Sequence, residues 1–233
     1  MMYGQEIGCA PFGGALLGWV RHRAGQRTPR HGHDHACLHV VVRGLYVEHS
    51  CDGTIVAGPG DLVFKEPEIE HSNRFGTTGA ESLRFELPDP DVLESLRAEL
   101  ASARGLERVL RAAQVLNSPR SERGSERVAP QVELLQRLRQ AFREPVVLSQ
   151  LAREIGVHRS HLTRQFARDF GCSPQVYVAL KRAAWTAEQL ALGGDTLTSI
   201  AHGAGFADQS HCTRVFKRAF GSTPSRWSRE SRW

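Results

Sequence analysis

Five histidines in the first third of the chain share a spacing that could build a ligand site. All five have odd numbers: His31, His33, His35, His39 and His71. On one unbroken strand the first four would point to the same face, because successive side chains of a strand alternate between its faces. Imidazole is a common neutral ligand of zinc and other divalent metals. Three interpretations stay open here: a metal site, a small-molecule pocket without metal, and a polar face without a ligand.

The cysteines and the potential catalytic residues do not suggest a second kind of site. The five cysteines are scattered without a Cys-x-x-Cys pair: Cys9, Cys37, Cys51, Cys172 and Cys212. Neither a thiolate zinc site nor a disulfide framework is therefore predicted, and we expect the cysteines to be small buried apolar residues. No nucleophile, base and orienting residue stand out together, so the sequence does not predict an enzyme.

Short apolar segments surround the histidines and would have to position them. Between about Ala15 and Leu87, runs of β-branched and apolar residues alternate with Gly, Pro and Asp turns, as in CLHVVVRGLYVEHS and GTIVAGPGDLVF. Runs of this length and composition are typical of strands. The segment is therefore predicted to form a small antiparallel barrel or sandwich, closed on itself to hide its strand edges.

The histidine segment resembles the cupin barrel, whose first motif is His-x-His followed by Glu and Gly, and whose second motif supplies a later His. The resemblance matches His33 and His35 to the paired histidines, Gly44 to the closing glycine and His71 to the later histidine. His39 stands where cupins have a metal-binding Glu. The effector or metal site that the resemblance implies consists of His33, His35, His39 and His71. A divalent metal in the barrel is therefore one possible cofactor.

A second departure from the cupin pattern lies just before the later histidine. Glu68 stands where the second cupin motif usually has Gly. This position follows the turn GPGD at Gly58 to Asp61.

The other end of the chain contains one pattern twice. The first copy runs from Leu148 to Tyr177 and the second from Leu197 to Trp227, with an offset of 49 residues that becomes 50 after one insertion. In each copy an apolar-periodic segment ends at a glycine, and a second helical segment follows a short turn. This is the shape of a helix-turn-helix, whose second helix lies in the DNA major groove. The alternative is a plain helical hairpin with a charged face, and the duplication favours DNA binding.

The two halves of the chain also differ in net charge. Residues 1–129 contain 15 Lys and Arg against 17 Asp and Glu, a balance of −2, whereas residues 130–233 contain 15 against 8, a balance of +7. The surplus of cations therefore lies in the half with the duplicated pattern, where it could neutralise DNA phosphates. A solvated basic surface without a partner is the alternative.

Helical spacing also appears between the two halves. Apolar residues within Pro90 to Leu116 predict two helices that pack on the barrel or on a second subunit. Residues 117–129 have the polar, Pro- and Gly-containing composition of a linker. A helix from Pro174 to Leu192 would join the two copies and span roughly 26 to 29 Å. Successive major-groove faces are about 34 Å apart, so two recognition helices on this rod could reach adjacent turns of the duplex.

The last hundred residues resemble the AraC/XylS family of bacterial transcription regulators. The likeness follows Ile200 to Trp227 almost residue by residue, and an N-terminal cupin-like sensory domain is the common arrangement of that family. Cys212 stands where the family usually has Phe, and Thr186 and Gln189 stand where its connecting helix usually has Ala and Leu. By position, the resemblance implies base contacts from both recognition helices, made by Ser160, Thr163, Arg164, Gln209, Ser210, His211 and Arg214.

The predicted fold class is therefore α+β with two domains. A cupin-like antiparallel β-barrel with flanking helices would occupy residues 1–116 and bind the effector and a second subunit. After a linker at 117–129, an all-α domain at 130–233 would contain helix-turn-helix units at about 148–171 and 197–221.

The predicted function is sequence-specific transcription regulation controlled by a small effector or metal. The expected partners are double-stranded DNA, a small-molecule effector, RNA polymerase and a second copy of the chain, with no membrane. No apolar run approaches a membrane span and the N-terminus lacks a secretory pattern, so we expect a cytoplasmic protein. The alternatives from other classes are a metal-dependent cupin enzyme fused to a DNA-binding domain and an architectural DNA-bending protein.

Overall fold

The structure is a computed structural model that describes residues 4–12, 15–87 and 129–230. The two helices predicted between Pro90 and Leu116 lie outside the described residues, and so does the predicted linker apart from Ala129. Within the described residues, no helix has both the length and the apolar character needed to cross a membrane.

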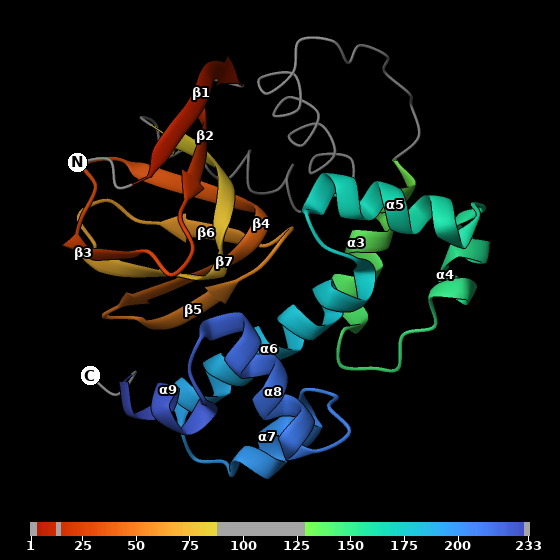
Figure 1. Cartoon of the computed structure of the whole chain (residues 1–233). Helices are drawn as coiled ribbons and strands as arrows, with labels where there is room; N and C mark the ends of the chain where they lie inside the picture. Colours follow the sequence, from red (N-terminus) through yellow and green to blue (C-terminus); the bar gives the residue numbers. More distant parts are fainter. Residues whose placement is uncertain (1–3, 13–14, 88–128, 231–233) are drawn as a thin grey trace.

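The N-terminal part is an antiparallel sheet that curls around its own interior, here called the barrel (Figure 1). Its strands are β1 (Gln5–Phe12), β2 (Ala15–His22), β3 (Arg27–His31), β4 (Ala36–Ser50), β5 (Gly53–Ala57), β6 (Leu62–Lys65) and β7 (His71–Leu87). The hydrogen-bonded order is β1-β2-β7-β4-β5, with β3 paired to β7 and β6 paired to β4. The predicted antiparallel sheet is therefore confirmed.

The long strands β4 and β7 form the centre of the barrel and pair from Ala36 with Leu87 to Ser50 with His71. Their register shifts on both sides of Gly44, which has a φ of +76°. A Cβ atom at Gly44 would lie 2.0 Å from the carbonyl oxygen of Gly79, so only glycine lets the two backbones approach here. The position that matches the closing glycine of cupins is thus a bulge in the central strand pair.

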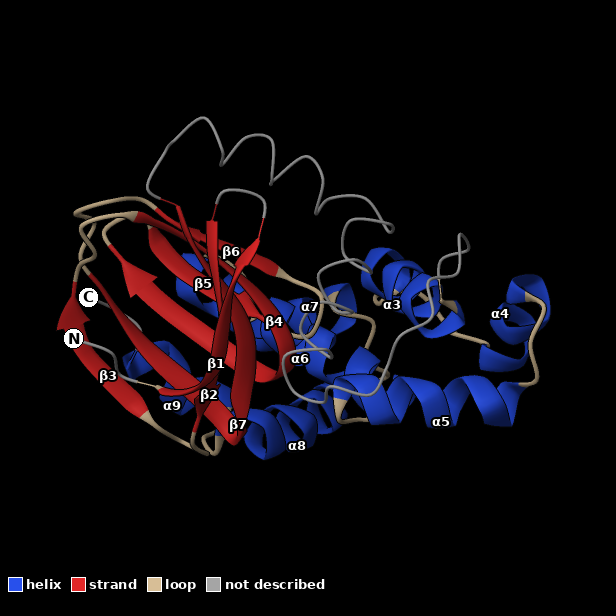
Figure 2. Ribbon diagram, turned by 90° about the horizontal axis from the view of Figure 1, so that it is seen from above, coloured by secondary structure: helices blue, strands red, loops and turns tan. Residues whose placement is uncertain are grey.

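The C-terminal part consists of helices in the order that the duplicated pattern predicts (Figure 2). They are α3 (Pro130–Ala141), α4 (Leu148–Ile155), α5 (Arg159–Phe170), α6 (Pro174–Leu192), α7 (Leu197–Gly203), α8 (Gln209–Phe220) and α9 (Pro224–Glu230). The pairs α4–α5 and α7–α8 are the two helix-turn-helix units, and α6 joins them.

Local signals in the sequence fix most of the helix ends. Gly156, Gly171 and Gly221 all adopt positive φ after their helices. The Asp208 side chain caps α8 by accepting a hydrogen bond from the His211 backbone N–H at 2.7 Å, as its residue type suggests. For α5 the N-cap is His158, whose ring nitrogen Nδ1 accepts a 3.3 Å hydrogen bond from the Ser160 backbone N–H.

Each helix-turn-helix unit contains a cluster of packed aromatic rings, and the two clusters are equivalent. In the first unit the ring centroid of Phe166 lies 4.7 Å from that of Phe170 and 5.7 Å from that of Tyr177. In the second unit the equivalent distances are 4.6 Å from Phe216 to Phe220 and 5.8 Å from Phe216 to Trp227. The sequence repeat is therefore a repeat of packing as well. All six rings are buried, so each cluster contributes a large apolar area to the core of its unit.

The barrel and the helices share a packed interface. Leu45 and Val56 of the barrel belong to one apolar cluster with Ala183, Phe216 and Trp227. Asp61 of the barrel forms ion pairs with Lys181 at 2.5 Å and Arg139 at 3.1 Å. All described strands end before residue 88 and all described helices begin after residue 129, while the predicted domain bounds themselves stay a prediction.

The expectation that the cysteines are buried is only half right. Cys37 and Cys212 are buried, Cys172 is half-buried, and Cys9 and Cys51 are exposed.

Candidate nucleic-acid interface and barrel site

Helices α5 and α8 expose the side chains for which base contacts are predicted. Ser160 and Arg164 on α5 are exposed and Thr163 is half-buried. The apolar side chains of α5 lie on its other face, where Leu162, Phe166 and Phe170 are buried.

The second helix repeats this arrangement. Its exposed side chains include Gln209, Ser210 and Arg214, and His211 is half-buried. In the described part of the chain, neither Arg164 nor Arg214 takes part in an ion pair, so both guanidinium groups can turn to an external partner. The base contacts themselves stay a prediction.

One orienting residue next to α8 is not predicted from the sequence. The Thr198 hydroxyl of α7 donates a 2.7 Å hydrogen bond to Oε1 of Gln209. This contact engages Oε1, so the Gln209 amide would approach an external partner through its NH₂ donors. A polar residue at the second position of the preceding helix is the only signal in the sequence, and it is too common to identify such a role.

Three histidines come together at one end of the barrel. Nitrogen atoms of His31, His33 and His71 all lie within 4.8 Å of one another. His31 ends β3, His71 begins β7, and the two face each other in the strand register. His33 lies in the loop after β3, where its carbonyl accepts a 2.8 Å hydrogen bond from the Glu68 backbone N–H. Glu68 has a φ of 65°, a conformation that glycine adopts at less cost, and Gly is usual at this place in cupins.

The idea that His31 to His39 share one unbroken strand is wrong. The strand is interrupted between His31 and Ala36, so the alternation of side chains does not continue through the segment. His35 is exposed and lies outside the group of three. His39 is buried on β4, where its Nδ1 atom is 3.3 Å from the Ser82 hydroxyl. Of the four histidines predicted for the site, the structure therefore groups His33 and His71, and adds His31.

A buried ion pair adjoins the histidines. The Lys65 ammonium lies 2.6 Å from Nε2 of His71 and 3.2 Å from a carboxylate oxygen of Glu48. The Tyr46 hydroxyl contacts the same carboxylate and lies 2.8 Å from Oδ1 of Asn73. Lys65 and Glu48 are each only 5% exposed. Charged residues in otherwise apolar strand segments are the one sequence signal for this pair.

Burial keeps these imidazoles neutral at ordinary pH. Desolvation, with a smaller contribution from the charge of Lys65, lowers the pKa of His33 to about 3. The same two causes, in the same order, lower the pKa of His71. Desolvation also lowers the pKa of Lys65, and the neighbouring Glu48 carboxylate opposes that shift.

A resident metal does not fit this arrangement, although neutral imidazoles are good ligands. Nδ1 of His71 is 3.1 Å from the Ile69 carbonyl and its Nε2 is 2.6 Å from the Lys65 ammonium, so both ring nitrogens are engaged. The buried ammonium also places positive charge where a cation would bind. By contrast, Nε2 of His33 is buried without a hydrogen-bond partner among the described residues. An unpaired buried nitrogen fits the hydrogen-bonding group of a small polar ligand.

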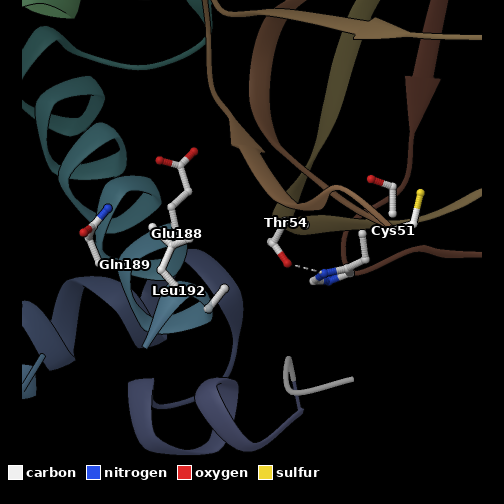
Figure 3. Close-up of a pocket in the computed structure, with 9 residues that line it drawn as sticks. Cys51, Thr54, Glu188, Gln189 and Leu192 are labelled. Atoms are coloured by element: carbon white, nitrogen blue, oxygen red, sulfur yellow. Dashed lines mark hydrogen bonds between the residues drawn. The ribbon is translucent and has the colours of Figure 1, made fainter. Parts of the chain in front are cut away.

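A cleft lies where the barrel meets the end of α6 (Figure 3). It has a volume of about 440 Å³, and Cys51 and Thr54 face Glu188 and Leu192 across it. The Glu188 carboxylate already accepts a 3.2 Å hydrogen bond from the Val56 backbone N–H, and burial raises its pKa. The charged group of the cleft is thus part of the contact between α6 and β5.

The sequence matches two family models. Residues 14–184 match the AraC-like ligand binding domain, and residues 151–230 match a helix-turn-helix domain. The chain is similar to the HTH-type transcriptional regulator ExsA of Pseudomonas aeruginosa, with 38% identity over 80 residues, which is 34% of this chain and 28% of ExsA. It is also similar to the HTH-type transcriptional activator RhaS of Pectobacterium carotovorum, with 34% identity over 101 residues, which is 43% of this chain and 36% of RhaS.

Among solved structures, ToxT from Vibrio cholerae matches 92% of this chain and 98% of its own, with 10% identity and a TM-score of 0.42. The matched stretches span about a third of the length of the curated relatives. The model of the ligand-binding domain, in contrast, covers more than half of the chain. With a cupin-like barrel followed by two helix-turn-helix units, the chain belongs to the AraC family of transcriptional regulators.

Proposed function

We propose that the protein is a sequence-specific, DNA-binding transcription regulator whose barrel binds a small polar effector. One observation carries the DNA-binding part: α5 and α8 are structurally equivalent helices that expose arginines at equivalent positions, Arg164 and Arg214. Arginine is the side chain that most often reads guanine in the major groove, through paired hydrogen bonds to O6 and N7.

The geometry of the connecting helix supports this function. Helix α6 has 19 residues and therefore spans roughly 28 Å. Tyr177, near its start, belongs to the first apolar cluster, and Ala183 and Ala187 in its middle pack with Trp227 in the second, so α6 has fixed contacts with both helix-turn-helix units. Two recognition helices held in this way suit adjacent turns of one face of the duplex.

Affinity for DNA should fall steeply with salt. The helical half has a charge balance of +7, so binding should release counterions from several phosphates. Between 50 and 200 mM salt we expect at least a roughly 100-fold loss of affinity for a fluorescently labelled duplex, measured by anisotropy. A flat response to salt would contradict phosphate-driven binding, and equal affinity for selected and random DNA would favour an architectural protein.

The barrel supports the effector part of the proposal. The unpartnered Nε2 of His33 lies at the same end of the barrel as the paired Lys65 and Glu48, so a ligand would meet one open imidazole nitrogen among polar groups that already pair with one another. Such a mixed set suits a small molecule with several polar groups. A metal-dependent enzyme is the less favoured function, because Lys65 engages the histidine that would bind the metal.

Metal titration should separate the two possibilities for the barrel. We expect the wild-type protein to bind Zn²⁺ weakly, and Lys65→Met to bind it at least about tenfold tighter, because the variant frees His71 Nε2 and the Glu48 carboxylate. Isothermal titration of both proteins, with circular dichroism to check folding, measures the difference. Adding His33→Ala to Lys65→Met is the control and should abolish the gain. Tight binding of one Zn²⁺ by the wild-type protein would overturn the effector assignment.

Three further partners and properties belong to the same proposal. RNA polymerase and a second copy of the chain, joined through the barrel, are included on the family resemblance. Location in the cytoplasm is proposed on the same basis.

A further inference from the structure

The barrel contacts the C-terminal ends of both recognition helices. The last four carbonyls of any α-helix lack partners within the helix and must find donors elsewhere. In α5 and α8 the glycine after the helix supplies the first donor, since Gly171 N–H bonds to the Ala167 carbonyl and Gly221 N–H to that of Lys217. The next donors come from the barrel.

Arg43 of β4 supplies them for α5. Its Nη2 group donates a 2.7 Å hydrogen bond to the Arg168 carbonyl, and its Nε group donates one of 3.4 Å to the Asp169 carbonyl. The contact is close, because a Cβ atom at Gly171 would lie 2.9 Å from Cδ of Arg43. A cation at this end of a helix also interacts favourably with the helix dipole.

Two residues of β7 do the same for α8. The Thr77 hydroxyl donates a 2.6 Å hydrogen bond to the Arg218 carbonyl, and Nη2 of Arg74 donates one of 3.0 Å to the Phe220 carbonyl. The backbones also approach here, since a Cβ atom at Gly76 would lie 3.1 Å from the Ala219 carbonyl oxygen. Figure 2 shows α8 beside β7, at the end of the barrel from which α5 extends.

The two sets of donors belong to one rigid unit. Strands β4 and β7 are the central hydrogen-bonded pair of the barrel, and Arg43 faces Glu81 in their register. The predicted base-contacting side chains lie in the first halves of the two helices, away from the ends that the barrel contacts. The relative placement of α5 and α8 is thus fixed twice, by α6 and by the paired strands.

We propose that Arg43, Arg74 and Thr77 are positioning residues for DNA recognition, through which the barrel sets the spacing between the operator segments read by α5 and α8. This inference rests on the proposed DNA-binding function. Each base pair inserted between the two segments moves them by about 3.4 Å and turns them by about 35°. A protein whose recognition helices are held at both ends should tolerate this poorly, whereas one held by α6 alone should tolerate it better.

The test uses the full-length protein and an operator that the wild-type protein selects from random DNA. Affinity is measured for this operator and for versions with one base pair added or removed between the two segments. We expect the affinity of the wild-type protein to fall at least about tenfold on either change. The affinity of the variant Arg43→Met/Thr77→Val should fall less than about threefold. Arg74 is kept, because its guanidinium also lies 5.2 Å above the Trp227 ring and its loss would disturb the core.

Controls separate positioning from stability. Arg43→Lys/Thr77→Ser keeps donors at both places and should restore the wild-type spacing profile. Thr77→Val alone changes one exposed hydroxyl and serves if the double variant unfolds; it should relax the profile in the same direction. Arg30→Met removes an arginine from an exposed pair of the barrel and should change nothing.

The outcomes are distinct. If the double variant and Thr77→Val both keep the wild-type spacing profile, or lose affinity equally for all spacings, the positioning role is overturned while the DNA-binding function stands. If the wild-type protein selects no sequence, the proposed function fails and the positioning role fails with it.

Discussion

Replacing Glu48 with alanine should lower the free energy of unfolding by about 3–5 kcal/mol, as measured by chemical denaturation at pH 7. The change removes the carboxylate that lies 3.2 Å from the Lys65 ammonium and leaves that cation 5% exposed without its counter-charge. Taking an unpaired charge out of water is among the most destabilising changes that a single substitution can cause.

The pH dependence of the variant identifies the cause. Desolvation already lowers the pKa of Lys65, and without Glu48 nothing of comparable strength opposes that shift. The unfolded chain, with a lysine pKa near 10.4, then binds more protons than the folded chain, so stability should rise as pH is raised toward about 10. The deficit of Glu48→Ala should therefore shrink between pH 7 and 10.

Two further variants make the comparison quantitative. Glu48→Leu/Lys65→Met removes both charges and should recover at least about 1 kcal/mol relative to Glu48→Ala, without the rise at high pH. Glu70→Ala breaks an exposed pair with Arg30, which is shorter at 2.9 Å, and should cost less than about 1 kcal/mol. Equal losses for Glu48→Ala and Glu70→Ala would show that the barrel interior is well hydrated.

The helical half was largely predictable because its signals are local. The glycines that end the helices, the Asp208 cap and the spacing of Phe166, Phe170 and their repeats each depend on residues within a few positions of one another. Duplication also strengthens the prediction, since an error in one copy would conflict with the other.

The barrel was harder to predict because its site depends on contacts between distant residues. Alternation along a strand is reliable only while the strand continues, and here it is interrupted between His31 and Ala36 and shifted again around Gly44. The pairing of Lys65 with Glu48 does not follow even from strand register, in which Lys65 faces Cys37 while Glu48 faces Ile55 and Asn73.

The hydrogen bonds from the barrel to the recognition helices are the contacts that the sequence predicts least. Arg43 and the Arg168 carbonyl are separated by 125 residues, and any exposed arginine could have taken that role.

The double variant Arg164→Ala/Arg214→Ala should lose about 2–6 kcal/mol of binding free energy for the selected operator, roughly 30-fold to 10⁴-fold. Each arginine that reads a guanine contributes about 1–3 kcal/mol, and the two lie on different helices, so their effects should add. Each single variant should also relax base preference at one operator position. The measurement is affinity across a library of single-base operator variants.

A matched control separates base reading from charge. Arg168 and Arg218 lie one helical turn further along the same two helices and are exposed, so Arg168→Ala/Arg218→Ala removes the same formal charge from the same elements; Arg168 differs from Arg164 in that it pairs with Asp169. If Arg164 and Arg214 read bases, only their replacement should flatten the preference at two positions, while both double variants reduce the salt dependence. Half or more of the hydrogen bonds between proteins and DNA go to the phosphates and sugars of the DNA backbone, so contact with phosphates is the alternative role for the two arginines. An equal loss on every operator variant, with preferences intact, would show that Arg164 and Arg214 hold phosphates, and base reading would then fall to Gln209 and its neighbours on α8.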